Sequence, residues 1–441
     1  MISIAHKIEI KPNNKQKTYF AKAFGCSRFA YNWGLAEWKR RHEQGEKCSA
    51  YEIKKSFNAI KKEQFPFVTE VSKYVTQQPF VNLGSAFEKF FTNLKSGEIC
   101  YPQFKKKRDN AGSFYIGGDR VYLSDTDKVF KEQPPVSKSK KRQYVKIPLL
   151  GWVKMTERLR FSGKINGLII SQKGDKYFAS FSVKITEAEY KRTHPKASRK
   201  QNRSVGIDLG VKTVAVLSDG LSVDGPKPMH RYKRKIAKLS RQLDKRTHAR
   251  TKQEKLAGVK KSNNYIKLAK RLANAHRRIV NVRMDFSQKF TTVLVRHYSR
   301  IAVEDLDCNG IIMANRIRMP IYDVSMGEII RELKYKSSLY GTTLVQAGTF
   351  FPSSRMCSCC GNVRRRLTLY ERIYRCDKCG YIADRDFNAS RNLLGLTCNH
   401  QIGMDYPEST PADLTALRKR FMRNGIATSK VETGKQRDIC R

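Results

Sequence analysis

The sequence predicts a multidomain protein of the α/β class, in which a helical module, a strand-rich module and a second α/β module share one chain. Three observations support this prediction. The chain has 441 residues, which is more than one hydrophobic core usually organises. The period of its apolar residues changes from that of a helix to that of a strand near residue 95. Five of its eleven cysteines crowd between residues 357 and 379.

The first 200 residues alternate between strand and helix patterns. Isoleucines in residues 1–15 alternate with polar residues, as in a strand, and residues 16–95 have helical spacing, for example at Phe20 and Phe24. Residues 96–200 return to a period of two. We therefore expect a β-barrel built from residues 1–15 and 96–200, with residues 16–95 inserted as a helical module.

A second architecture begins after the basic, aperiodic residues that end near 204. Strands are predicted at 205–210 and 299–304, a helix at 325–339, a strand at 342–346 and a short helix from 386. This order predicts an α/β sheet.

Three acidic side chains lie at the ends of these elements. Asp208 lies inside an apolar strand, Glu304 ends the next strand, and Asp386 opens the last helix. Taken singly, a strand-terminal Glu or a helix-capping Asp has an ordinary structural role. Together the three could converge at one edge of the sheet. Because Mg²⁺ prefers oxygen ligands and paired ions promote phosphodiester hydrolysis, we expect two catalytic Mg²⁺ ions there.

The crowded cysteines have the spacing of a zinc site. Four of them form two Cys-x-x-Cys pairs, each followed by Gly: Cys357 with Cys360, and Cys376 with Cys379. Four thiolates are the tetrahedral set that Zn²⁺ prefers, and they leave no open coordination position. We expect one structural Zn²⁺. Cys359 has no counterpart in the second pair and is expected to be a spare thiol.

The charge of the chain predicts a polyanionic partner. There are 88 Lys and Arg against 39 Asp and Glu, a formal charge of +49, which long nucleic acid relieves most efficiently. Nineteen Lys or Arg and two acidic residues lie between residues 231 and 283, where helical spacing predicts two basic helices in contact with nucleic acid. Since no apolar run reaches the length of a membrane helix, we expect a cytoplasmic protein without a membrane partner.

These motifs resemble, in order and spacing, the TnpB family of transposon-encoded RNA-guided DNA nucleases, which is related to type V CRISPR effectors. The matching segments are residues 206–210 (GIDLG), 303–306 (VEDL), the two Cys-x-x-Cys pairs, 384–390 (DRDFNAS), 28–35 (RFAYNWGL) and 101–107 (YPQFKKK). The resemblance covers nearly the whole chain to about residue 396.

The resemblance implies a specific domain order. Residues 1–15 and 96–200 would form a wedge β-barrel, and residues 16–95 a helical recognition lobe inserted in it. Residues 201–350 and 383–400 would form an RNase H-like nuclease domain of the RuvC type, and residues 351–382 a zinc ribbon that binds nucleic acid. Residues 401–441 are expected to form a mobile tail, because they contain prolines and few apolar residues.

The resemblance also implies an activity. The protein would bind a guide RNA from the transposon end, recognise a short motif beside its target and cleave double-stranded DNA by two-metal hydrolysis. The catalytic residues would be Asp208, Glu304 and Asp386. The family pattern places the last Asp two residues before the Asn of Asp-x-Asn-Ala, which selects Asp386, with Asp384 as the alternative.

Six residues are expected to contact nucleic acid: Arg28, Tyr31, Asn32, Lys105, Lys106 and Lys107. The lysine run favours phosphate contact, because a lysine is a point charge that discriminates little between bases. The aromatic run near Arg28 fits a helical core as well as it fits a nucleic-acid contact.

Three alternatives stay open at this point. The protein could be a small type V CRISPR effector that diverged from TnpB, and the sequence does not separate this from a transposon protein. It could be a guide-directed DNA-binding regulator without cleavage, although the presence of all three carboxylates argues against this. It could be a DNA transposase, against which bound RNA of defined sequence would count. A monomer is expected.

Overall fold

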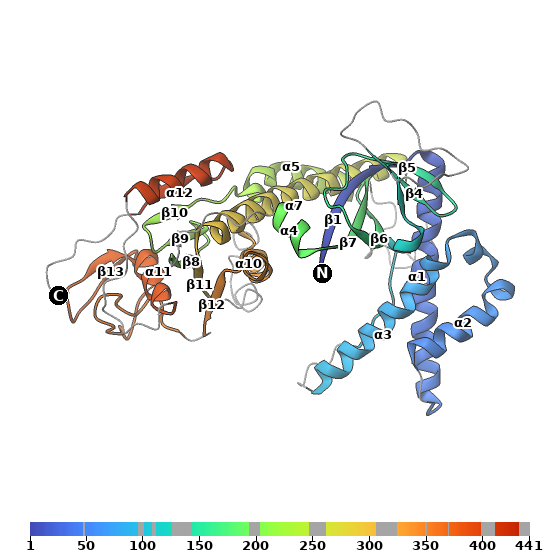
Figure 1. The fold of residues 1–441 in the computed structure, drawn as a ribbon, viewed down its shortest axis with the longest axis horizontal. Helices are drawn as coiled ribbons and strands as arrows, with labels where there is room; N and C mark the ends of the chain where they lie inside the picture. Colours follow the sequence, from blue (N-terminus) through green and yellow to red (C-terminus); the bar gives the residue numbers. More distant parts are fainter. Residues whose placement is uncertain are drawn as a thin grey trace. The chain divides into compact units, whose positions relative to one another are not determined.

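A computed structural model gives the fold of the protein (Figure 1). It describes residues 1–46, 49–95, 101–107, 112–125, 143–193, 203–246, 262–305, 324–348, 351–368, 370–397 and 411–431. The chain divides into two compact units, Met1–Pro195 and Lys196–Arg441. Throughout these described ranges, every helix is either too short or too polar to cross a membrane.

The first unit combines an antiparallel sheet with helices. Its seven strands follow the order β2-β6-β7-β1-β5-β4-β3. Its strands are β1 (Ile2–Lys11), β2 (Ser113–Gly117), β3 (Tyr122–Leu123), β4 (Tyr144–Ile147), β5 (Gly151–Met155), β6 (Lys164–Lys173) and β7 (Lys176–Ile185). Its helices are α1 (Asn14–Glu43), α2 (Ala50–Gln64), α3 (Lys73–Lys95) and α4 (Glu187–Thr193), with short 3-10 turns at Pro66–Glu70 and Gly118–Arg120.

Strand β1 lies in the middle of this sheet. It pairs with β7 on one side, where Ile8 faces Ala179, and with β5 on the other. Ile8 and Ile10 are buried, as the alternation of the sequence predicts. Helices α1 to α3 lie between β1 and β2 in the chain, so the helical module is an insertion into the sheet.

The predicted closure into a barrel is not seen among the described strands. β2 and β3 end the sheet, and no pairing joins them in this part of the chain. Alternating apolar residues specify strands, whereas closure also depends on strand tilt and stagger, which the sequence pattern does not report.

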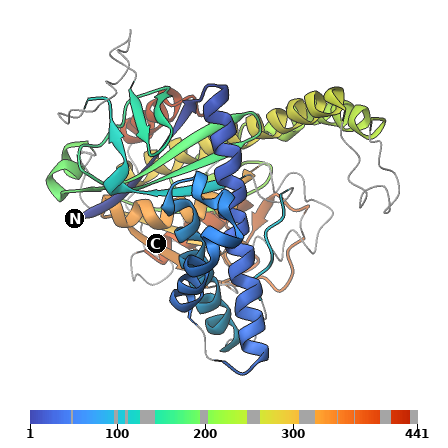
Figure 2. The same ribbon diagram turned by 90° about the vertical axis from the view of Figure 1, so that its right-hand side faces the viewer.

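Aromatic side chains hold the helices on the sheet and on one another. Phe20 and Phe24 of α1 contact Phe114 of β2, with ring centroids 5.8 and 5.6 Å apart. Trp38 of α1 stacks on Phe87 of α3 at 4.0 Å. Figure 2 shows these helices in dark to light blue. The aromatic run of α1 therefore contributes to the core.

The second unit contains a six-stranded mixed sheet in the order β12-β11-β8-β9-β10-β15 and a two-stranded sheet, β13-β14. Its strands are β8 (Ser204–Leu209), β9 (Ala215–Leu217), β10 (Leu221–Val223), β11 (Arg300–Glu304), β12 (Thr343–Ala347), β13 (Ile373–Arg375), β14 (Ile382–Asp384) and β15 (Thr428–Lys430). Its helices are α5 (Pro228–Asp244), α7 (Asn263–His297), α10 (Met326–Tyr340), α11 (Arg385–Gly395) and α12 (Pro411–Arg423). The strands and helices predicted for this sheet are confirmed.

Helices cover both faces of the six-stranded sheet. Val205 and Ile207 of β8 pack in one core with side chains of α7, α10 and α12. On the opposite face, Leu393 of α11 packs against Ala302 of β11 and Ala347 of β12. Because side chains alternate along a strand, the residues between these apolar positions point toward α11.

The two predicted basic helices are α5 and α7, and residues 247–261 between them lie outside the described part. Leu239 of α5 and Leu268 and Ala275 of α7 form a small apolar contact between the helices. The pair carries many basic side chains, and α7 also exposes the apolar residues Ile266, Val280, Val282 and Met284.

The prediction of a mobile tail is wrong for residues 411–431. Leu417 and Phe421 of α12 are fully buried, and β15 pairs with β10. These two apolar residues are four positions apart and so share one helix face, a spacing that matters more than the low apolar content of the segment. The rest of the predicted tail, 401–410 and 432–441, lies outside the described residues.

A buried histidine lies where α12 meets α7. His297 has Nε2 2.9 Å from Nη1 of Arg203 and Nδ1 3.3 Å from Nη1 of Arg420. Arg203 also pairs with Asp413 of α12. Burial, and then the charges of Arg203 and Arg420, lower the pKa of His297 to about 4.

This pKa predicts acid-sensitive docking of α12. The unfolded chain binds a proton at His297 near pH 6.5, and the folded chain does so only near pH 4. The contribution to stability is therefore present above pH 6.5 and is lost as the pH falls toward 4, by about 3 kcal/mol in total. Thermal unfolding should show a flatter pH dependence over this range in His297→Gln, whereas His42→Gln, at an exposed position on α1, should match the wild type. Parallel curves for all three proteins would contradict this.

Candidate functional site

Two of the predicted carboxylates lie on neighbouring strands. β8 and β11 are parallel, with Ile207 opposite Val303, so Asp208 and Glu304 each follow a paired position. Ile207 and Val303, the residues before them, point into the core formed with α7, α10 and α12. Because side chains alternate along a strand, Asp208 and Glu304 point to the other face, which α11 covers. The sequence predicted that these residues would meet at one sheet edge, and the register brings them there.

Gly206 allows α11 to approach this face closely. A Cβ atom at Gly206 would lie 2.0 Å from the backbone oxygen of Ser390 and 2.4 Å from the backbone nitrogen of Leu394. Since real side-chain atoms do not tolerate such distances, only glycine fits at this position of β8. The contact holds the second half of α11 against the strand that carries Asp208.

The two neighbouring aspartates at the start of α11 have different environments. Oδ1 of Asp384 accepts hydrogen bonds from the backbone nitrogens of Asp386 (2.9 Å) and Phe387 (3.0 Å), so Asp384 is the N-cap of the helix. Asp386 lies in the first turn, 3.3 Å from Nε of Arg385 and 3.6 Å from Nη1 of Arg372. The carboxylate of Asp384 is therefore used to cap the helix, whereas the carboxylate of Asp386 contacts the side chains of Arg372 and Arg385.

The carboxylates affect one another through their charges. Burial raises the pKa of Asp208 well above its ordinary range, and the nearby Glu304 and Asp386 raise it further, while Arg385 opposes them. Like charges held together in this way are stabilised by a bound cation. The three side chains offer carboxylate oxygens, the ligand type that Mg²⁺ prefers, but unlike the four cysteines they are not grouped around a single ion position.

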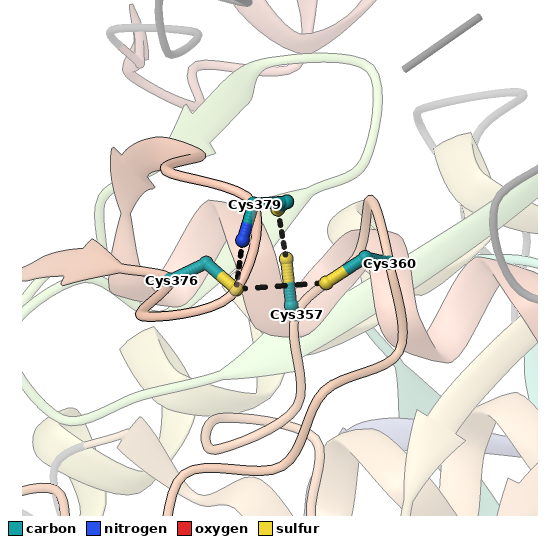
Figure 3. A group of neighbouring side chains, drawn as sticks. All are labelled: Cys357, Cys360, Cys376 and Cys379. Atoms are coloured by element: carbon teal, nitrogen blue, oxygen red, sulfur yellow. Dashed lines mark hydrogen bonds between the residues drawn. The ribbon is translucent and has the colours of Figure 1, made fainter. Parts of the chain in front are cut away.

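The four predicted cysteine ligands form a tight group (Figure 3). Their sulfur atoms all lie within 4.8 Å of one another, and among the described residues this is the one set of three or more His, Cys, Asp or Glu side chains placed for a single ion. The sulfurs of Cys357 and Cys379 are 3.7 Å apart, and those of Cys360 and Cys376 are 3.5 Å apart. Tetrahedral zinc with bonds of 2.3 Å separates its sulfurs by about 3.8 Å, so the group fits Zn²⁺.

The surroundings act differently on the four thiols, since burial raises the pKa of Cys357 and of Cys379. Burial raises the pKa of Cys376, but hydrogen bonds from the backbone of Cys379 and Lys378 outweigh it and lower that pKa to about 7. The expectation that Cys359 is a spare thiol is wrong, because its sulfur is engaged in a disulfide. The zinc-ligand set of four is unaffected.

Three residues that the sequence analysis did not single out connect the cysteine group to α11 and β11. Asn388 and Asn392 of α11 hydrogen-bond the backbone of residues 353–358, and the hydroxyl of Ser353 donates to Oε1 of Glu304. The Asp-x-Asn-Ala pattern contains Asn388 and could have pointed to its role. No sequence pattern pointed to Ser353, because its partner Glu304 is 49 positions away.

In the first unit, the predicted nucleic-acid residues form one local arrangement. The side-chain amide of Asn32 makes both hydrogen bonds to the backbone of Lys105, donating to its oxygen (3.0 Å) and accepting from its nitrogen (2.8 Å). Nζ of Lys105 lies 3.8 Å from the ring centroid of the buried Tyr31. These contacts occupy Tyr31 and Asn32, and they fix the position of Lys105. Direct contact of either residue with nucleic acid stays a prediction.

Lys105 and Arg28 line a cavity that has both polar and aromatic walls. The cavity has a volume of about 110 Å³, and Gln78 and Asn82 of α3 also line it. Lys106 and Lys107, which follow Lys105 in the sequence, are exposed. The structure thus brings Arg28 and Lys105 together, while Lys106 and Lys107 lie on the surface.

Three known protein families match segments of the chain. A helix-turn-helix domain of the OrfB type from IS605 elements matches residues 1–47, where the structure has β1 and the single helix α1. The "Probable transposase" family of the same type matches residues 181–314, which include Asp208 and Glu304. A Cas12f1-like TNB domain matches residues 327–393, which include the four cysteines and Asp386.

Curated relatives align with most of the chain. A protein of Streptomyces pristinaespiralis, "Putative RNA-guided DNA endonuclease", is 28% identical over 395 residues, covering 88% of each chain. InsQ of Escherichia coli (strain K12), with the same designation, is 26% identical over 426 residues, covering 91% of this chain and 96% of its own. Among solved structures, the mini-RNA-guided endonuclease CRISPR-Cas phi3 aligns over 93% of this chain and 94% of its own, with 9% identity and a TM-score of 0.45. Segments of the chain thus match models of OrfB-type transposase domains, and curated relatives of similar length are named "Putative RNA-guided DNA endonuclease".

Proposed function

We propose that the protein is an RNA-guided DNA endonuclease. Asp208, Glu304 and Asp386 would be the metal-binding residues that catalyse hydrolysis of the phosphodiester bonds. The observation that supports this proposal is that Glu304 of β11 and Asp386 of α11 lie near enough to Asp208 of β8 for their charges to raise its pKa, after burial. The names of the curated relatives support the same activity.

The topology of the second unit supports an RNase H-like nuclease domain of the RuvC type. Along the chain, β8, β9 and β10 pair antiparallel to one another in turn. The next two strands, β11 and β12, run parallel to β8. In the sheet the strands follow the order β12-β11-β8-β9-β10, and β15 pairs at the end with β10. Asp208 lies on the central strand of this order. Residues 351–382 would be its zinc-ribbon insert.

Each acidic residue has a distinct task in this proposal. Asp208 and Glu304 would provide carboxylate oxygens from adjacent strands, and Asp386 would provide another from the helix above them. Mg²⁺ bound by this set would activate water and stabilise the leaving oxygen. Asp384 holds the first turn of α11 and so fixes where Asp386 lies. Arg372 and Arg385 limit the repulsion among the carboxylates.

The ribbon would hold one structural Zn²⁺ through Cys357, Cys360, Cys376 and Cys379. Four sulfur ligands close the coordination shell, so this ion would take no direct part in hydrolysis. Arg364, Arg365 and Arg366 are nearby in the ribbon sequence, and Tyr370 is 94% exposed there. Cationic and aromatic side chains of this kind suit nucleic-acid contact.

Several basic surfaces could serve a guide RNA and its DNA target. α5 and α7 carry basic side chains on their polar faces, and Arg28 and Lys105 converge on the cavity of the first unit. Lysine ammonium and arginine guanidinium groups bind phosphates without reading sequence, as a heteroduplex channel requires. Gln78 and Asn82 offer amides that can recognise base edges. Whether the guide derives from a transposon end or from a CRISPR array depends on the neighbouring DNA.

An isosteric pair of variants tests the catalytic carboxylates. Asp386→Asn removes the charge needed for Mg²⁺, whereas Asp384→Asn retains an oxygen that can cap α11. Single-turnover cleavage of guide-matched DNA should fall on the order of a thousandfold or more for Asp386→Asn, Asp208→Asn and Glu304→Ala, because each loses a metal ligand worth several kcal/mol in the transition state. Asp384→Asn should stay near the wild-type rate.

The same variants should retain their nucleic acids. Filter-binding measurements should give nearly unchanged affinity for guide RNA and for target DNA, since pairing and basic surfaces hold these partners. If Asp384→Asn is inactive and Asp386→Asn cuts, the ligand assignment between the two is wrong. Normal cutting by Asp208→Asn would contradict the proposed chemistry itself.

Removal of one cysteine tests the zinc site. Cys360→Ser and Cys379→Ser should each lose the ion, because a serine hydroxyl does not replace a thiolate in a structural zinc site. Cys26→Ser provides a control, since Cys26 is a buried free cysteine of the first unit. Metal analysis of purified protein should find about one zinc per chain in the wild type and in Cys26→Ser. Full zinc content in the ribbon variants would refute the assignment.

A further inference from the structure

We infer that Ser353 is a positioning residue for Glu304, and that the zinc-binding loop which carries Ser353 thereby sets the geometry of the catalytic carboxylates. The inference rests on the proposed function, because it requires Glu304 to be a metal ligand. It adds a role for the ribbon that is separate from nucleic-acid contact.

The hydroxyl of Ser353 is built into the site. Ser353 is 4% exposed, and its Oγ–H group donates to Oε1 of Glu304. A carboxylate at the end of a strand can rotate about its side-chain bonds. A hydrogen bond from a buried hydroxyl restricts that rotation and leaves the second oxygen, Oε2, available for a cation. Outer partners of this kind orient metal ligands and tune their affinity.

Helix α11 fixes the backbone that carries this serine. Nδ2 of Asn392 donates to the backbone oxygens of Ser353 and Met356, at 2.7 Å each. Nδ2 of Asn388 also donates to Met356 at 2.7 Å, and its Oδ1 accepts from the backbone nitrogen of Ser358 at 2.9 Å. Both asparagines are buried on the helix that carries Asp386.

These contacts surround a zinc ligand. Cys357 lies between Met356 and Ser358, the two residues whose peptide groups Asn388 holds. A zinc ion bound to Cys357 would hold the loop through that side chain, and the asparagines of α11 hold its backbone through hydrogen bonds. Glu304 is attached through Ser353 and Asp386 through the helix. The loop therefore links the sulfur site to two of the three carboxylates, while Asp208 is held independently by the register of β8.

The test compares two hydroxyl deletions within the ribbon. Ser353→Ala removes the hydrogen bond to Glu304. Thr368→Ala is the matched control, because the Thr368 hydroxyl donates to Glu371 at 2.9 Å, inside the ribbon. Ser353→Thr keeps a hydroxyl at the first position, and Asp208→Asn reports on the proposed function.

Two readouts are needed. The full-length protein, freed of nucleic acid, is titrated with Mn²⁺ and the free ion is followed by electron paramagnetic resonance. Mn²⁺ binds N, O and S sites more weakly than Zn²⁺ does, so the zinc stays in place during the titration. Zinc content and single-turnover cleavage with guide RNA are measured on the same preparations.

We expect Ser353→Ala to keep its zinc and to bind Mn²⁺ about tenfold or more weakly, with cleavage restored in part at high Mg²⁺. Thr368→Ala and Ser353→Thr should match the wild type. Unchanged Mn²⁺ affinity in Ser353→Ala, loss of its zinc, or equal weakening in Thr368→Ala or Ser353→Thr would each overturn the inference. Normal cleavage by Asp208→Asn would instead refute the proposed function, so the two failures are distinguishable.

Discussion

The contact between Gly206 of β8 and the backbone of α11 is the constraint on which the candidate site depends. Any side chain at position 206 would collide with the backbone of Ser390 and Leu394. The glycine permits a helix to lie directly on the strand next to Asp208. Without that approach, Asp386 would not reach the carboxylates of the sheet, and Asn388 and Asn392 would not reach the loop that carries Cys357. One missing side chain thus makes both sites possible.

In the proposed function, one helix of the second unit would join two kinds of metal chemistry. Its first turn carries Asp386, a hard oxygen donor, and its buried asparagines hold the peptide groups beside Cys357, a soft sulfur donor. Burial, and then the charges of Glu304 and Asp386, raise the pKa of Asp208, which the register of β8 and β11 holds beside Glu304. The basic composition of the chain has a different role, since it suits long-range attraction of nucleic acid rather than hydrolysis.

The sequence predicted those features that depend on local pattern. Alternation predicted β1, β8 and β11, and the same alternation placed Asp208 and Glu304 on one face of the sheet. Cysteine spacing predicted the group of four sulfurs. Features that depend on tertiary contact were missed or wrong: the docking of α12 through Leu417 and Phe421, and the bond from Ser353 to Glu304. The sequence left Asp384 as the alternative to Asp386, and only the backbone geometry at the start of α11 shows that Asp384 caps the helix.

The central claim is that the carboxylates between β8, β11 and α11 form a divalent-cation site distinct from the sulfur site. Crystals of the complex grown with Mn²⁺, with anomalous difference maps recorded at the Mn and Zn absorption edges, test it most directly. The account predicts Mn²⁺ peaks in contact with Asp208, Glu304 and Asp386, and a separate Zn²⁺ peak among the four cysteines. Mn²⁺ bound elsewhere on the second unit, with these three carboxylates free of metal, would contradict it.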